Sequence, residues 1–414
     1  MASIVPPKPT IQPKHDPIRL AHDLRDQLAS AKRRTALFLG AGTSISANVP
    51  SLDKLTGIVD RTLPAPYQEL YRGLSGLVGS HANLEEVLNK IRTIRELLEG
   101  SSGGTYSGLS HELAIKLDSA ICRLIYDNVA APPDLGKLHA HKSFATWLRY
   151  VRRDSPVEVF TTNYDVLLEI AFEAVGVPFF DGFVGAVSPF FVPECIEAEP
   201  GRTSEDVYPP RTWIRLWKLH GSVNWQLIPR TAPAADRICR VTGTSPPAEG
   251  TQLLIYPSKE KYVQSQRLPF VVYMDRLRRM IQSGECLLLI IGFSFRDDHI
   301  TEVLSQGLRS NPRLAITVVL HDKPTAHVLS LSEMYKNLSV LSPQEACVGG
   351  IRGSWLPPRK KQPGEEWPFW DDVANSFVLG DFSKFAEFLN LMTGYSDTVA
   401  SASAPSAAGT APSP

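Results

Sequence analysis

Three short apolar runs along the chain each end at a glycine or at a polar turn. The runs at 35–39 and 287–291 lead directly into Gly40 and Gly292, and the run at 157–160 leads into polar residues. Unbroken apolar runs of this length are typical of parallel strands that are buried on both faces. Helical patterns alternate with them, so the chain is predicted to be an α/β protein with a doubly wound, Rossmann-like parallel sheet.

A long helical stretch interrupts this alternation. Apolar residues recur there at helical spacing, most clearly after Asn83 and Glu86, which have the spacing of a capping box. We therefore expect a helical insertion between the first strands. The predicted organisation is a flexible arm at 1–15, a sheet domain at 16–345 with the insertion at about 62–140, a helical segment at 346–398 and a disordered tail at 399–414.

The bulk composition is that of a globular protein, with 43% hydrophobic and 21% charged residues. Lys+Arg and Asp+Glu both number 43, so the formal net charge is zero. No basic excess therefore favours direct binding of nucleic acid by the chain as a whole.

The cysteines and the apolar runs indicate the cellular compartment of the protein. The five cysteines are scattered without a Cys-x-x-Cys pair, which argues against a zinc ribbon or a disulfide framework and fits a reducing cytoplasm. The first residues contain no apolar signal core, and the longest apolar run, 287–295, is too short to span a bilayer. We expect a soluble cytoplasmic protein without a metal site.

The first apolar run is followed by the glycine turn Gly40-Ala41-Gly42-Thr43-Ser44. Two glycines allow the backbone to turn sharply and to approach a phosphate, and the next helix can supply free N–H groups. As a dinucleotide fingerprint the turn is incomplete, because Ile45 stands at the position of the third glycine. A tight turn that binds nothing is the alternative.

Polar turns follow three further strands. They are Thr161-Thr162-Asn163-Tyr164-Asp165, His220-Gly221-Ser222 and Gly292-Phe293-Ser294. Strand ends of an open parallel sheet converge on one crevice, so these turns can form a single site. Asn163 offers a donor and an acceptor for a carboxamide, a ribose hydroxyl or an attacking water. Ser294 could bond a phosphate or a ribose, and His220 can titrate near neutral pH. The alternatives are a structural histidine and an Asp165 that only caps the next helix.

Four motifs, in this order, resemble a sirtuin-like domain of the bacterial branch that hydrolyses NAD in defence against phage. They are the glycine turn with Pro50, the turn at 161–165, Lys218-Leu219-His220-Gly221-Ser222, and Gly292-Phe293-Ser294-Phe295-Arg296-Asp297, after which Asp297 or Asp298 caps the next helix. The resemblance covers about residues 33–325, with gaps at the insertion and loops. It implies that Gly40, Ala41, Gly42, Thr43 and Ser44 form the phosphate-binding loop, that Asn163 and His220 are catalytic, that Asp165 lies at the nicotinamide–ribose end, and that Gly292 and Ser294 form the second nucleotide-binding turn. NAD+ is then the substrate, and no metal is needed.

Two departures from protein deacylases favour the hydrolase branch. The paired Cys-x-x-Cys zinc module of those enzymes is absent, and the chain reads Pro50-Ser51-Leu52-Asp53 where they have Asp-Phe-Arg after the proline. An NAD-dependent protein deacylase is the first alternative. A catalytically silent nucleotide-binding or assembly subunit is the second.

The resemblance also has implications beyond the chain itself. A free NAD hydrolase would be toxic, so we expect an effector of abortive infection that is held inactive until it is triggered. We also expect a homo-oligomer, and a partner such as a DNA-translocating ATPase or a short Argonaute.

Overall fold

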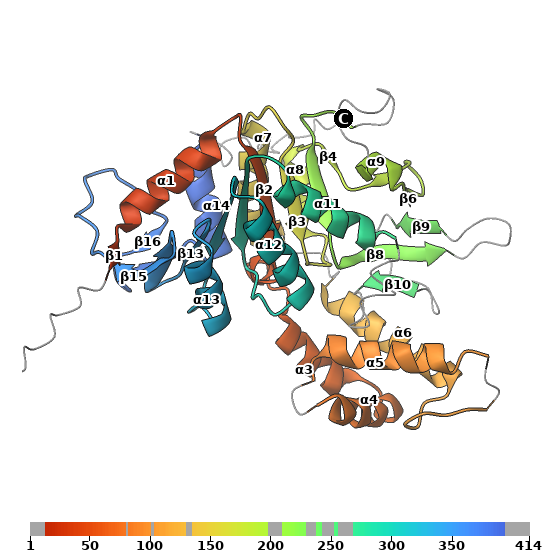
Figure 1. The fold of residues 1–414 in the computed structure, drawn as a ribbon. Coiled ribbons are helices and arrows are strands. Elements are labelled where there is room, and N and C mark those ends of the chain that lie inside the picture. Colours follow the sequence, from red (N-terminus) through yellow and green to blue (C-terminus); the bar gives the residue numbers. More distant parts are fainter. Residues whose placement is uncertain are drawn as a thin grey trace, which may run out of the picture.

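The computed structural model describes residues 13–79, 82–100, 103–129, 135–197, 209–228, 237–241, 252–255 and 268–393. Its centre is a ten-stranded sheet, which is mostly parallel (Figure 1). In spatial order the strands are β1 (Lys14–His15), β15 (Ile351–Trp355), β14 (Glu345–Val348), β13 (Leu338–Leu341), β12 (Leu314–Val319), β11 (Cys286–Ile291), β2 (Arg34–Leu39), β3 (Glu158–Thr161), β7 (Ile214–Lys218) and β4 (Phe179–Phe180).

The order of the strands reverses between β2 and β11. After β2 the sheet grows through β3 and β7 to one edge, and the chain then returns to place β11 on the other side of β2. This is the topological switch point of a doubly wound sheet, where ligands bind outside the carboxyl ends of the strands. The predicted fold class is therefore confirmed.

The central strands end level with one another. Leu39 at the end of β2 lies opposite both Ile291 of β11 and Thr161 of β3, and Thr161 lies opposite Lys218 of β7. Four of the polar turns of the sequence therefore begin along a single line across the sheet.

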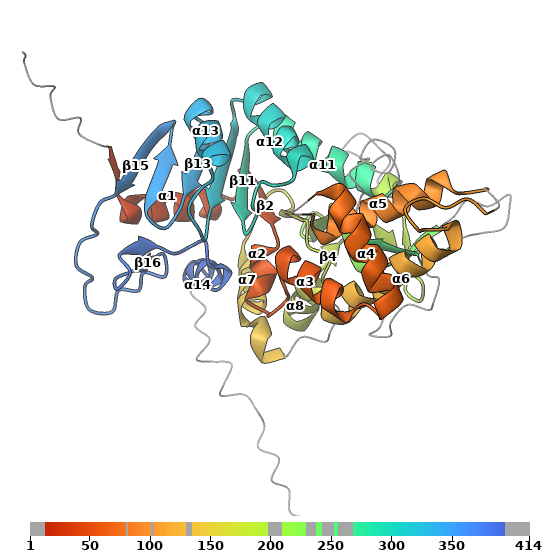
Figure 2. The same ribbon diagram turned by 90° about the horizontal axis from the view of Figure 1, so that it is seen from below.

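Helices cover both faces of the sheet (Figure 2). Side chains of β11 alternate between the faces, with Leu287 and Leu289 in one hydrophobic cluster and Leu288 and Ile290 in the other, as the period of a strand requires. The first face carries α1 (Pro17–Ala29), α7 (His139–Tyr150), α8 (Leu167–Val175) and α14 (Phe382–Leu391), and the second carries α11 (Phe270–Gln282), α12 (Asp298–Ser310) and α13 (Ala326–Met334).

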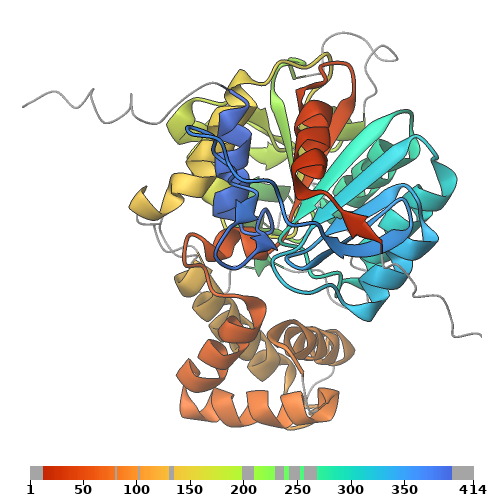
Figure 3. The same cartoon turned by 90° about the vertical axis from the view of Figure 1, so that its left-hand side faces the viewer.

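The helical insertion lies between β2 and β3 and projects from the sheet domain (Figure 3). It consists of α3 (Leu52–Thr62), α4 (Ala65–Val78), α5 (Leu84–Leu97) and α6 (His111–Val129), and the capping box at Asn83 is present. These helices share a hydrophobic cluster of their own. The cluster also contains Val223, and Tyr164 and Val166 pack against it. The insertion therefore packs against the polar turns that contain Asn163 and His220.

A smaller sheet stands beside β7. Its strands, in order, are β10 (Gln252–Ile255), β8 (Gly221–Ile228), β9 (Arg237–Arg240), β6 (Phe190–Phe191) and β5 (Phe183–Val184). The segments 176–212 and 229–250 contribute β5, β6 and β9 to it. The remaining short elements are α2 (Gly42–Ile45), a 3-10 turn at Leu135–Leu138, α9 (Glu194–Glu197), β16 (Trp370–Asp371) and β17 (Ser376–Phe377).

The prediction for the end of the chain needs correction. Residues 346–398 were expected to be helical, but β14 and β15 form an antiparallel hairpin that continues the main sheet. Gly349 and Gly350 both have positive φ at its turn, and a Gly-Gly pair between apolar runs is itself a hairpin signal. Helix is confined to α14 in the described part of this segment.

The arm also differs from its prediction where it is described. Lys14 and His15 pair with β15, so the ordered sheet begins before residue 16. Residues 1–12 and the tail at 399–414 lie outside the described residues.

His141 gives the packing of α14 on α7 a pH dependence. The ring is 1% exposed, its Nδ1 has no hydrogen-bond partner among the described residues, and its centroid lies 5.0 Å from that of Phe382. Burial lowers the pKa of His141 from its ordinary value of 6.5 to about 4. As the pH falls below 6.5, His141 is therefore protonated in the unfolded chain before it is protonated in the folded chain. The free energy of unfolding falls over this range, down to about pH 4.

We expect the free energy of unfolding to fall by about 2 kcal/mol between pH 6.5 and pH 5 from this group alone. In His141→Leu the pH dependence should be shallower by about that amount, because the other titrating groups are unchanged. Urea unfolding at the two pH values measures the difference. Equal slopes for the parent and the variant would contradict a neutral, buried His141.

Candidate functional site

The two glycine turns contact each other at the switch point. The Gly40 N–H donates to Ile291 O and the Gly42 N–H donates to Gly292 O, each at 2.9 Å. A Cβ on Gly40 would lie 2.4 Å from Gly292 O, and one on Gly292, where φ is +69°, would lie 2.7 Å from Thr43 N. The contact between the turns by itself requires glycine at Gly40 and Gly292. These glycines are therefore no evidence for phosphate binding, which remains a prediction.

Asn163 links its turn to the first glycine turn. Its Nδ2 donates to Gly40 O at 3.1 Å and lies 3.1 Å from Thr43 Oγ1 and 2.8 Å from Ser44 Oγ. The Ser44 hydroxyl in turn donates to Asp165 Oδ2 at 2.6 Å. The structure therefore brings together five of the residues that the sequence nominated.

One atom of this network is left without a partner. Asn163 is only 9% exposed, yet its Oδ1 is buried and accepts no hydrogen bond within the described part of the chain. A buried carbonyl oxygen that lacks a donor costs about 1–3 kcal/mol. Such an atom fits a site where a ligand hydroxyl or a water completes the bonding.

Asp165 serves two elements at once. The structure places Val166, and not Asp165, at the N-cap of α8, one residue from the predicted cap. Its Oδ1 nevertheless accepts from the Leu167 N–H at 3.1 Å. One carboxylate oxygen thus orders the start of the helix and the other orders the glycine turn.

His220 is paired with an aspartate from the turn after β11. Its Nε2 lies 3.0 Å from Asp297 Oδ2, and the ring is 6% exposed. Asp297 Oδ1 accepts from the N–H groups of His299 and Ile300, as the N-cap of α12. A neutral ring that donates Nε2–H to the carboxylate carries its lone pair on Nδ1, the nitrogen that can then accept a proton.

Sequence reasoning missed this role of Asp297. The residue was assigned, with Asp298 as the alternative, only to the helix cap. The pairing joins residues 77 positions apart, so no local spacing signals it. It follows from the level ends of β7 and β11, which are separated in the sheet by β2 and β3.

Asp297→Asn tests the pair without removing the cap, because asparagine caps helices about as well as aspartate. We expect turnover by the His220 site to fall about 10- to 100-fold, since a charge-assisted hydrogen bond contributes roughly 1.5–3 kcal/mol. The thermal midpoint should stay near that of the parent. Asp298→Asn is the matched control, because Asp298 is exposed on the same helical turn, and parental turnover is expected. Parental turnover in Asp297→Asn as well would mean that the pairing has no catalytic consequence.

Two nominated residues keep their side chains outside this network. Ala41 and Ser294 are exposed, and no described hydrogen bond joins Ser294 to the Asn163 cluster. The turn that carries Ser294 is anchored instead by Phe293, whose ring centroid lies 4.8 Å from that of Phe38 and 5.0 Å from that of Phe295. The backbone of Gly292 is thereby fixed against the glycine turn, with Ser294 facing outward.

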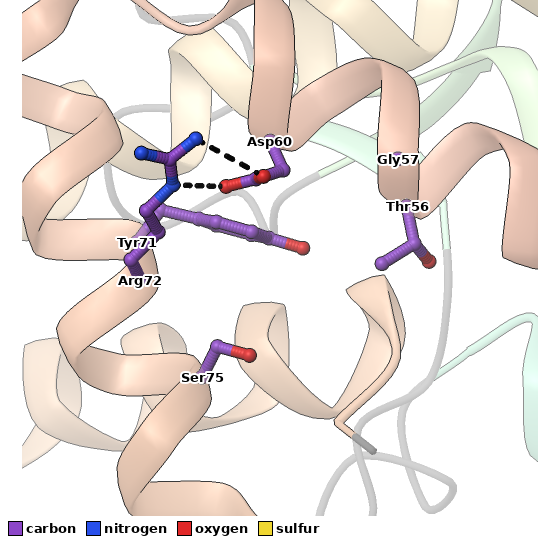
Figure 4. Close-up of a pocket in the computed structure, with 6 residues that line it drawn as sticks. All are labelled: Thr56, Gly57, Asp60, Tyr71, Arg72 and Ser75. Atoms are coloured by element: carbon purple, nitrogen blue, oxygen red, sulfur yellow. Dashed lines mark hydrogen bonds and ion pairs between the residues drawn. The ribbon is translucent and has the colours of Figure 1, made fainter. Parts of the chain in front are cut away.

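A cavity of about 310 Å³ lies elsewhere, between α3 and α4 of the insertion (Figure 4). Its lining includes Tyr71, Thr56 and Ser75 together with an ion pair between Arg72 and Asp60, whose closest atoms are 2.7 Å apart. Burial and the nearby Asp60 charge raise the pKa of Tyr71 to about 12. None of the motif residues lines this cavity, so the candidate site is assigned from the converging turns.

Within the described ranges, no group of three or more His, Cys, Asp and Glu residues is arranged to hold a metal ion. The same ranges contain no helix that is long and apolar enough to cross a membrane.

Comparison with known protein families gives a match to a segment of the chain that contains part of this site. Residues 157–341 match a family model described as a SIR2-like domain. The matched segment contains Asn163, His220 and Asp297, and it begins after the glycine turn at 40–44. A search of curated proteins gives no match.

Solved sirtuin structures resemble the chain at low identity. One, described as "The Structural basis of Sirtuin Substrate Affinity", is 15% identical with a TM-score of 0.35 and covers 73% of this chain and 86% of its own. A SIR2 complex with the inhibitor EX-527, 2'-O-acetyl-ADP-ribose and deacetylated p53 peptide, and Sir2Tm bound to a propionylated peptide, are each 13% identical, with TM-scores of 0.33 and coverage of 73% and 87%.

Proposed function

We propose that this chain is an NAD+ hydrolase that cleaves the nicotinamide–ribose bond to give nicotinamide and ADP-ribose. The match to a SIR2-like domain supports an NAD-dependent activity in general. The observation that carries the specific proposal is the unpartnered Oδ1 of Asn163 beside a glycine turn, at the same edge of the sheet as the His220–Asp297 pair.

The reaction requires little covalent chemistry from the protein. Cleavage passes through an oxocarbenium-like state, as glycoside cleavage does, and the bonding electrons leave with a neutral nicotinamide. In our proposal Asn163 Oδ1 accepts from a ribose hydroxyl or from the attacking water. His220 accepts the proton that the water loses as its oxygen bonds to the ribose carbon. Positioning and charge stabilisation then supply most of the catalysis.

Incubation with NAD+ alone tests the proposal. The purified chain should release nicotinamide and ADP-ribose in equal amounts without any acylated peptide, which chromatography of the reaction measures. Release that requires an acylated peptide would support the protein deacylase instead. Binding of NAD+ or ADP-ribose without turnover would support the silent subunit, and either result would overturn the hydrolase proposal.

The absence of the paired-cysteine zinc module favours the hydrolase over the deacylase. The five cysteines are far apart in the sequence, and those at 122, 239, 286 and 347 are buried. Burial raises the pKa of the Cys286 thiol to about 12, so this thiol is kept from the thiolate form that binds zinc.

We further propose that the activity depletes NAD+ in phage-infected cells, as the effector of an abortive-infection system. The support is the order of the four motifs, which resembles that branch. The chain would act as a homo-oligomer with a low basal activity, which a trigger or a partner such as a DNA-translocating ATPase or a short Argonaute raises. Cellular NAD+ should then fall after infection in cells that carry the chain, and not in cells that carry its His220→Ala variant.

A further inference from the structure

Lys218 is a buried cation that contacts two turns of the candidate site. It is the last residue of β7, stands two residues before His220, and is 1% exposed. Its Nζ donates to the backbone oxygen of Asp165, to Glu169 Oε1 at 2.8 Å and to Ser222 Oγ at 2.8 Å. Nothing in the proposed chemistry uses this ammonium group, although it stands within the His220 motif.

The contacts of Lys218 reach both polar turns that carry the proposed catalytic residues. Asp165 belongs to the turn of Asn163, and Ser222 belongs to the turn of His220. The same two turns are joined by the Val223 N–H, which donates to Tyr164 O at 2.9 Å. The ammonium group is therefore shared between the two turns.

The ion pair with Glu169 explains how a lysine can be charged at this depth. The side chains of Lys218 and Glu169 are 2% and 11% exposed, and a buried charge needs a partner and hydrogen bonds. Such pairs add little stability compared with apolar residues of similar volume, because both charges must be desolvated. A contribution to stability is therefore a weak explanation for a lysine at position 218. Its contacts with the two turns are a better explanation.

We propose that Lys218 is a positioning residue that holds the Asn163 turn and the His220 turn in one fixed geometry. This inference rests on the proposed hydrolase function of the same site. Lys218 acts through the Asp165 carbonyl oxygen and the Ser222 hydroxyl, and has no contact with substrate in this role. Its loss should lower kcat, because the turns shift relative to each other, while KM for NAD+ changes little.

The test uses two variants of the full chain. Lys218→Met leaves Glu169 buried without its partner and is expected to destabilise the fold. Lys218→Met with Glu169→Leu removes both charges, and its thermal midpoint should return to near the parental value. In this folded double variant we expect kcat to be about 10- to 100-fold lower, the range that a small misplacement of catalytic groups produces, with KM within about threefold.

Lys116→Met is the control for loss of a lysine, because Lys116 is 54% exposed on α6 of the insertion. It should keep parental kcat and KM. Parental kcat in the double variant would overturn the inference, and so would a rise in KM that accounts for the whole loss of kcat/KM.

Hydrogen–deuterium exchange separates this inference from the proposed function. In the double variant, amides of both turns, at 161–166 and 219–224, should exchange faster than in the parent, while those of β12 should not change. This readout needs no turnover. If the parent released no nicotinamide, the hydrolase proposal would fail, and faster exchange at both turns would still support Lys218 as their common anchor. Unchanged exchange at both turns would overturn it.

Discussion

His220→Ala is expected to lower kcat for NAD+ hydrolysis by about 10²- to 10⁴-fold, which is the usual contribution of a general acid–base residue. The substitution removes the group that accepts the water proton, and it leaves Asp297 with its role as the cap of α12. The fold should therefore persist, and the thermal midpoint should change by only a few degrees. Initial rates of nicotinamide release across a range of NAD+ concentrations measure the effect.

Asn163 should be as sensitive, for a different reason. Asn163→Ala removes both the unpartnered Oδ1 and the amide group that bonds Gly40, so it should lower kcat and weaken NAD+ binding together. His327→Ala is the control for both variants, because His327 is exposed on α13. Parental rates in His220→Ala or Asn163→Ala, with the control also at the parental rate, would show that these residues are not catalytic.

Gly292→Ala should be strongly destabilising, because both the backbone conformation and close backbone contacts oppose a methyl group there. The new Cβ would stand 2.7 Å from Thr43 N and 3.0 Å from Gly42 Cα, both backbone atoms that cannot rotate away. Alanine at a φ of +69° adds about 1–2 kcal/mol of conformational strain, and overpacking adds about 1–3 kcal/mol. We expect the free energy of unfolding to fall by about 2–5 kcal/mol, and NAD+ hydrolysis to fall as the two turns separate.

Gly284→Ala is a closely matched control for this strain. Gly284 has the same φ of +69°, but a Cβ there would meet nothing within 4 Å. Its cost should be the conformational strain alone, about 1–2 kcal/mol, with hydrolysis near the parental rate. Chemical unfolding of the two variants side by side isolates the contact between the turns. Equal losses of stability would mean that the turns can move apart freely.

Much of the fold could be predicted because its signals are local. The apolar runs at 35–39 and 287–291 are buried strands, and the capping box at Asn83 marks a real helix start. The hairpin of β14 and β15 lies in the segment predicted to be helical, although the Gly349-Gly350 pair between its strands is a local hairpin signal. Trp367 and Phe369 pack in the core under α14.

The site was harder to predict, because its contacts join distant parts of the sequence. Motif order led to Asn163, His220 and the glycine turn, but it could not show that Gly40 and Gly292 require each other through backbone contact. Motif order also could not predict the second role of Asp297. One of its carboxylate oxygens caps α12, as the sequence indicates, and the other pairs with His220. Lys218 was visible in its motif without any sign of its partners.

The packing of the insertion has a mechanical consequence. Val223 lies within the hydrophobic cluster of α3–α6, and Tyr164 packs against it. Each is a close sequence neighbour of a proposed catalytic residue, and the two are joined by their own backbone hydrogen bond. A rigid displacement of the four helices would thus be transmitted to Asn163 and His220 together. A protein that bound only the outer surface of the insertion could switch the chemistry on or off without approaching NAD+.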